Sequence, residues 1–196
     1  MMRKIELIIG LSSILSLVLN LLLVPGGGVL TVLTLSIYSM FYFALSFVLL
    51  NNIGLKSAFK KESYKGISTV RIIGSVATGI VLSITIIGIL FKFQSYPGAN
   101  LELINGLAGM IIVLIVTQIR YIKTRNKFYI HVFKRLLIVG GFGLILILMP
   151  NGKLIDIKYR NHPEYAKALK NVTADPFNKD FQDKLQVERQ KMKDEK

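Results

Sequence analysis

The chain has 196 residues, of which 52% are hydrophobic and 18% charged, with a mean hydropathy of +0.53 and a formal net charge of +14 at pH 7. This composition excludes a soluble domain, since several apolar runs reach the roughly 20 residues that span a bilayer core. The runs are continuous rather than alternating over about 10 residues, which excludes a transmembrane barrel. The sequence therefore predicts an all-α fold, that of a polytopic helical membrane protein.

Charge is distributed unevenly along the chain. Residues 1–150 carry 14 Lys/Arg and 3 Asp/Glu, whereas residues 151–196 carry 11 and 8. The excess in the membrane part is typical of cytoplasmic loops loaded with Lys and Arg. No basic patch interleaved with aromatic residues lies outside it, so we expect no nucleic-acid partner. The chain has no cysteine, and His131 and His162 lack ligand spacing, so we expect no metal and no cofactor.

The first predicted span covers residues 5–24. Arg3 and Lys4 precede it, as in a signal peptide, but no small-residue cleavage site follows, so we interpret it as a retained helix. The link "PGGG" at 25–28 ends this helix and permits a tight reversal. A second span follows at 29–50, and its aromatic far half is typical of packing and interfacial anchoring.

Three further spans are predicted at 67–93, 101–119 and 129–149. The last is the weakest, because its uncharged part, residues 136–149, would make a helix of about 21 Å. It can cross the bilayer if the side chains of Lys134 and Arg135 reach back to the interface. A re-entrant or interfacial path is the alternative. The membrane domain is thus residues 1–150.

The orientation follows from the loops. Lys and Arg are concentrated at the N-terminus and in residues 51–66 and 120–135, whereas the turns at 25–28 and 95–100 have none. We therefore expect a bacterial cytoplasmic (inner) membrane protein with a cytoplasmic N-terminus and both turns external. Five crossings place the tail outside, although a short basic tail favours the inside. We favour the external tail.

Residues 151–196 form a predicted amphipathic helical tail. Pro163 suits the first turn of one helix, and Asp175-Pro176 is a typical start for a second. The tail is loosely similar to one tetratricopeptide unit, which cannot bury its apolar face alone. We therefore predict a hairpin that docks on a partner or on the membrane, through Tyr165, Leu169, Phe177, Phe181 and Leu185.

The membrane domain contains an internal repeat. When Pro25-Gly26 is aligned on Pro97-Gly98, Asn20 matches Lys92, and each half is a span, an external turn and a second span. The halves are therefore predicted to be two tandem hairpins with the same orientation. Small residues also recur at helical spacing and predict ridges for close helix packing, within the monomer or in an oligomer: Ser12 and Ser16 in the first span, and Ser75, Gly79 and Ser83 in the third.

The stretch "LFKFQSYPGANLELINGLAG" resembles the transmembrane hairpin of the L-type stator subunit of the gliding-motility and type IX secretion motor. The matching residues are Phe91-Lys92-Phe93 and Pro97-Gly98-Ala99, followed by Gly106 and Gly109. The stretch "LNLLLVPGGGVL" is similar to a worn second copy. The resemblance implies membership in a family of hairpin membrane proteins around a motor that couples ion flow to movement.

One departure from that family limits what the resemblance implies. The family's second helix carries a membrane-embedded glutamate about a dozen residues beyond the proline, whereas "GLAGMIIVLIV" here has no acid. Only Glu102, near the outer end of the helix, could take its place. We therefore do not carry over ion-driven motor activity from the family; only Lys92 is carried over, as the match to the family's membrane lysine.

Lys92 and Glu102 form a candidate intramembrane ion pair across the second turn. The alternatives are a weak exposed pair at headgroup level, a proton-sensitive pair near an ion path, or a contact to a partner helix. Glu6 and Arg71 could make a similar pair at the inner ends of their spans.

No enzyme constellation is present, so we predict a non-catalytic integral membrane subunit of a bacterial cell-envelope complex, and the resemblance implies a relation to the gliding-motility and secretion motor. Its partners would be the lipid bilayer and a second membrane protein or further copies of itself. The alternative is a small transporter or channel built from duplicated helical hairpins. The sequence lacks the intramembrane ionisable residues expected of a coupled carrier.

Overall fold

The computed structural model describes residues 2–58, 60–150 and 152–194. Over these ranges it is all-helical, without a strand, as predicted. Five of the described helices are long and apolar enough to cross a membrane: α1 (Met2–Leu21), α2 (Gly27–Leu50), α3 (Thr69–Gln94), α4 (Ala99–Thr124) and α5 (Lys127–Leu148).

The helix ends differ from the predicted spans by up to five residues, with the largest difference at the end of α4. The apolar run ends at Ile119, but the helix continues past Arg120 and Lys123 to Thr124. Arg125 then ends it with a positive φ of 49°. Hydropathy shows only where a helix stops being apolar. The helix itself continues until a residue adopts a non-helical backbone conformation.

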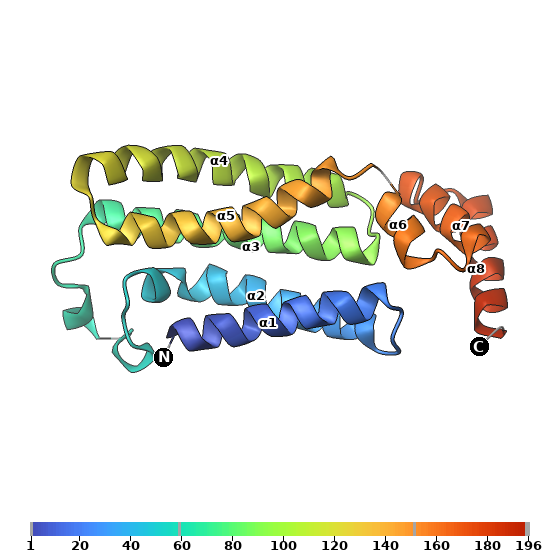
Figure 1. Ribbon diagram of the computed structural model, residues 1–196, viewed down its shortest axis with the longest axis horizontal. Helices are drawn as coiled ribbons and strands as arrows, with labels where there is room; N and C mark the ends of the chain where they lie inside the picture. Colours follow the sequence, from blue (N-terminus) through green and yellow to red (C-terminus); the bar gives the residue numbers. More distant parts are fainter. Residues whose placement is uncertain (1, 59, 151, 195–196) are drawn as a thin grey trace.

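The five long helices run side by side along the long axis of the molecule (Figure 1). Neighbours in sequence pack against each other, and α3 also packs against α5, so that α3 contacts α2, α4 and α5. Half of the apolar window of α3 is buried, compared with 22% for α1 and for α4. The helix α3 is therefore the centre of the bundle, and α1 and α4 keep most of their apolar surface outside.

The two hairpins, α1–α2 and α3–α4, have the same turn structure. Gly26 and Gly98 have φ of 81° and 78°, in the left-handed region that glycine adopts without strain. The backbone hydrogen bonds that close the two turns are equivalent when the hairpins are shifted by 72 residues, the separation of Pro25 and Pro97. In the first turn, Val24 N donates to Leu19 O (3.0 Å) and Leu23 N to Asn20 O (3.2 Å). In the second turn, Tyr96 N donates to Phe91 O (2.9 Å) and Ser95 N to Lys92 O (3.2 Å). This equivalence confirms the tandem hairpins.

The helix α5 runs from one end of the bundle to the other (Figure 1), so the structure does not have the re-entrant path. It ends beside the two hairpin turns, and we call this end of the bundle the turn end. The opposite end holds residue 2, the α4–α5 connection and the loop with the short helices η1 (Leu55–Ser57) and η2 (Lys61–Tyr64), and we call it the loop end.

The tail lies at the turn end and comprises α6 (Lys153–Lys158), α7 (Pro163–Ala174) and α8 (Lys179–Asp194). The helices α7 and α8 pack against each other, as the predicted tail hairpin requires, and α6 contacts α1 and α7. Pro163 occupies the first turn of α7, where its missing N–H has no helical acceptor to lose.

The predicted ridge of α3 faces α2 within the same chain. Gly79 is in close contact with α2, since a Cβ there would lie 2.6 Å from the backbone oxygen of Tyr42. On either side, Ser83 Oγ lies 2.7 Å from Ser39 Oγ, and Ser75 Oγ accepts a hydrogen bond of 2.9 Å from Asn51 Nδ2. The ridge therefore joins the two hairpins.

The ridge of α1 is shifted from the prediction. Ser16 is buried, as expected, but Ser12 is exposed and Ser13 is buried in its place. The buried polar residues Ser13, Ser16 and Asn20 follow an i, i+3, i+7 pattern, which lies on one helix face just as the predicted i, i+4, i+8 pattern does. Sequence spacing alone does not distinguish the two.

Candidate functional site

The side chains of Lys92 and Glu102 do not meet. Lys92, in the last turn of α3, donates a hydrogen bond to Asn100 Oδ1 in the first turn of α4. Glu102 is half-buried, and both side chains are described without an ion pair between them. The predicted ion pair across the turn is therefore replaced by an ammonium–amide hydrogen bond.

A buried charge pair lies instead at the loop end, between Glu6 of α1 and Arg135 of α5. Arg135 Nε and Nη2 donate to Glu6 Oε1 and Oε2, each over 2.6 Å, in a bidentate arrangement. The two side chains are only 12% exposed for Arg135 and 14% for Glu6. Tyr42 of α2 also donates to Glu6 Oε1, over 2.8 Å, and Arg135 Nη1 donates to the backbone oxygen of His131.

Further polar contacts surround this pair. The hydroxyl groups of Tyr38 and Tyr42 lie 3.2 Å apart, and Arg3 Nη2 lies 3.0 Å from His131 Nε2 and donates to Asn52 Oδ1. We call the group the loop-end cluster; it comprises Arg3, Glu6, Tyr38, Tyr42, His131 and Arg135. Its members come from α1, α2 and α5, so it ties the first hairpin to the last long helix.

The sequence did not identify this cluster. It treated Arg135 as a cation reaching back to the interface, and it considered Arg71 as the partner of Glu6. In the structure the guanidinium of Arg71 lies over the ring of Phe128, 4.9 Å from its centroid, and its Nε is buried without a hydrogen-bond partner. A usable signal was that Glu6 is one of only three acids in residues 1–150, because a charge near lipid needs a partner.

The chemistry that this cluster can do is limited by its bonds. Both oxygens of the Glu6 carboxylate accept hydrogen bonds from Arg135, so each oxygen already has a partner within the bundle. Within the part of the chain that the structure describes, no group of three or more His, Cys, Asp or Glu side chains could hold a metal ion. The arrangement is that of a tie between helices.

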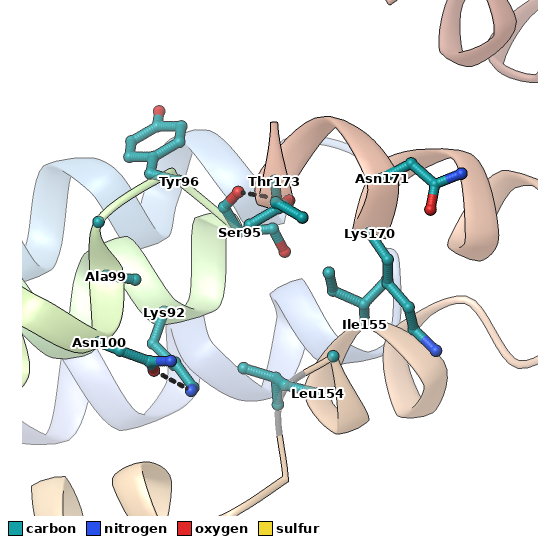
Figure 2. Close-up of a pocket in the computed structure, with 13 residues that line it drawn as sticks. Lys92, Ser95, Tyr96, Ala99, Asn100, Leu154, Ile155, Lys170, Asn171 and Thr173 are labelled. Carbon is teal, nitrogen blue, oxygen red and sulfur yellow. Dashed lines mark hydrogen bonds between the residues drawn. The ribbon is translucent and has the colours of Figure 1, made fainter. Parts of the chain in front are cut away.

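A second candidate site is a cavity of about 450 Å³ at the turn end, which we call the turn-end cavity. It lies between the second hairpin turn and the tail helices α6 and α7. Figure 2 shows Lys92 with Asn100 on the hairpin side and Lys170 and Asn171 on the tail side. Lys92 is thus placed in this cavity, although not beside an acid.

The tail contacts the end of α3 and its turn through two polar side chains. Thr173 Oγ1 donates to the backbone oxygen of Leu169 over 2.8 Å and also lies 3.3 Å from the backbone oxygen of Ser95 (Figure 2). Lys158 Nζ donates to the backbone oxygen of Phe93 over 3.4 Å. Burial lowers the pKa of Lys158 to about 8, because the site disfavours its charged form. Burial likewise raises the pKa of the neighbouring Tyr159.

The predicted docking face of the tail is only partly available. Tyr165 is 5% exposed and packs edge-on against Tyr159, with ring centroids 4.7 Å apart, so it belongs to the interior of the tail. Phe177 is 93% exposed. The other three residues of the predicted face are half-buried: Leu169, Phe181 and Leu185.

Comparisons of the chain with protein-family models, with curated proteins and with solved structures find no match. The function therefore has to be inferred from the residues and contacts described above.

Proposed function

We propose that this chain is a non-catalytic integral membrane subunit of a bacterial cell-envelope complex. It crosses the cytoplasmic membrane five times, with the loop end cytoplasmic and the turn end and tail external. The observation that carries the proposal is the buried Glu6–Arg135 pair, in which two charged groups of the bundle hold α1 to α5. The carboxylate and the guanidinium are bonded to each other in a bidentate arrangement, which suits a tie between helices rather than a site whose charges change partner.

The orientation is supported by the charges at the two ends of the bundle. Arg3, Lys4 and Lys123 lie at the loop end, together with the cations of the loop between α2 and α3, and the hairpin turns at 22–26 and 95–98 carry none. Cytoplasmic ends of membrane helices carry this excess of Lys and Arg.

A protein partner is supported by the tail. No residue of α8 is buried, and Phe177 just before it is almost fully exposed. An uncovered phenylalanine next to a half-buried apolar stripe, Phe181 and Leu185, is a surface that a second protein would cover. A relation to the gliding-motility and secretion motor rests on the resemblance of the second hairpin alone.

The alternative of a small transporter has less support. A Cβ at Gly88 would lie 2.8 Å from Leu103 Cα, and one at Gly106 would lie 2.8 Å from Thr85 Cα. The backbones of α3 and α4 are therefore in contact along this face and leave no passage between the two helices.

Photo-cross-linking in native cells tests the assembly role. A photoreactive residue replacing Phe177 should give a discrete adduct in the membrane fraction, either with a second envelope protein or with another copy of the chain. The same residue at the exposed Asp183 of α8 is the matched control and should give none. Absence of an adduct at position 177, together with a monomeric mass of the extracted protein, would contradict the proposal.

A further inference from the structure

The turn-end cavity is built by two parts of the chain that are distant in sequence. Residues 92–100 form the hairpin side, and residues 152–174 form the tail side. Each side contributes one lysine, Lys92 from α3 and Lys170 from α7, and no Asp or Glu is among the lining residues. Two cations and no anion around one cavity favour an anionic ligand.

A neighbouring cavity of about 360 Å³ strengthens the positive charge. It shares Lys170 and Asn171 with the turn-end cavity and adds Arg160 and Lys167. Its only acid is Asp156, which lies 2.5 Å from Lys170 Nζ in a partly exposed pair. Four cations, with Lys92 included, therefore surround the two adjoining cavities against one acid, and Lys170 keeps donors for a second anion.

The walls of the cavity carry hydrogen-bond donors of the kind that bind phosphate oxygens. An ammonium group has three donors, and Lys92 uses one of them on Asn100. Asn100 and Asn171 add side-chain amides to the lining. The two sides of the cavity are in contact, because Thr173 Oγ1 on the tail side lies 3.3 Å from the backbone oxygen of Ser95 on the hairpin side.

The remaining walls are apolar. Leu154 and Ile155 of α6 are buried and line the cavity, and the aromatic ring of Tyr96 stands at the hairpin turn (Figure 2). The cavity lies at the end of α3, where a membrane span would leave the bilayer. A site with a cationic side and an apolar side at this level suits an anion attached to a lipid.

We propose that the turn-end cavity binds a phosphate-bearing anion, which the positive charges of Lys92 and Lys170 attract from the two sides of the cavity. The source of the phosphate is the headgroup of an anionic phospholipid or free inorganic phosphate. The site belongs to the second hairpin alone, because the first hairpin has Asn20 and Gly28 at the positions equivalent to Lys92 and Asn100. The inference does not depend on the assembly role and would stand without it.

The test uses the full chain purified in a non-ionic detergent. In one arm, the protein is reconstituted with phosphatidylglycerol and phosphatidylcholine, and native mass spectrometry measures the lipid retained after extraction. In the other arm, inorganic phosphate is titrated calorimetrically into the lipid-free protein. The variants are Lys92→Gln and Lys170→Gln, with Lys92→Arg as the charge-preserving variant. Lys184→Gln, at an exposed lysine of α8, is the matched control.

We expect selective retention of phosphatidylglycerol or saturable binding of phosphate. Each glutamine variant should weaken this binding about fivefold or more, which is the loss expected for one lysine near a membrane surface. Lys92→Arg and Lys184→Gln should bind like the parent chain. Retention of the lipid without phosphate binding assigns the lipid headgroup as the source, and phosphate binding alone assigns the free anion.

Two outcomes would overturn the proposal. One is that neither phosphatidylglycerol nor phosphate binds, and the other is that Lys184→Gln weakens binding as much as the cavity variants, which would indicate general surface charge. If Lys92→Gln elutes as an aggregate, Lys170→Gln decides the question, because Lys170 is partly exposed and its replacement leaves the bundle intact.

Discussion

Replacement of Glu6 by glutamine should destabilise the bundle by removing the charge opposite Arg135. Two charge-assisted hydrogen bonds of 2.6 Å join these side chains, and a hydrogen bond to a charged group contributes about 1.5–3 kcal/mol. Removing one partner of a buried pair costs about 3–5 kcal/mol. Because Arg135 is 12% exposed near the loop end, it can partly reach water, so we expect a loss of about 3 kcal/mol for Glu6→Gln.

The measurement is a double-mutant cycle with Arg135→Met, which keeps the length of the side chain without its charge. Unfolding in mixed micelles with increasing anionic detergent, followed by circular dichroism, gives the free energy of unfolding of each variant. The double variant should lose less than the sum of the single losses, by about 2 kcal/mol, because neither charge is left alone. Glu102→Gln is the matched control and should change stability by under about 0.5 kcal/mol. A coupling energy close to zero would refute the tie between α1 and α5.

Three further predictions concern the tail, the hairpin interface and the topology. In the folded chain the pKa of Lys158 is lowered to about 8, so between about pH 8 and pH 10 the unfolded chain binds more protons than the folded chain. The thermal stability should therefore rise with pH in this range, and Lys158→Met should remove the rise. Gly79→Ala should destabilise by about 1–3 kcal/mol in the same detergent titration, because its Cβ would lie 2.6 Å from a backbone oxygen of α2. Gly74→Ala, with nothing within 4 Å, should be neutral or stabilising. In spheroplasts, an impermeant thiol reagent should label Asp180→Cys, and Lys123→Cys only after lysis; the reverse labelling would contradict the external tail.

The sequence predicted the helical architecture because each element carries its own local signal. Five apolar runs specify five helices long enough to cross a bilayer, and the Pro-Gly pairs specify where the chain reverses. The repeat could be found for the same reason, since Gly26 and Gly98 each need a left-handed conformation at the start of a helix. These features depend on residues that are close together in the chain.

The loop-end cluster could not be predicted in this way. Glu6 and Arg135 are 129 residues apart, and their contact exists only because α5 lies beside the first hairpin as well as the second. Helix periodicity allows both Ser12 and Ser13 on a packing face, and only the position of α2 decides that Ser13 is buried. Tyr165 was likewise assigned to an outer face of the tail. Its ring partner, Tyr159, precedes the predicted tail helix, so the helical periodicity gave no sign of the contact.

The two hairpins keep one geometry with different chemistry at the same positions. In the first, Thr31 Oγ1 donates to the backbone oxygen of Ser16 over 2.9 Å. At the equivalent place in the second, Gly88 lies against Leu103, so a larger side chain on one helix is matched by a smaller one on the other. Leu103 also reaches Gly143 of α5, where a Cβ would lie 3.4 Å from its Cδ1. The second hairpin thus packs against a third helix, α5. The apolar side chain of Leu103 fills the space between α3, α4 and α5, which the hydroxyl of a threonine bonded within its own hairpin, like Thr31, would not do.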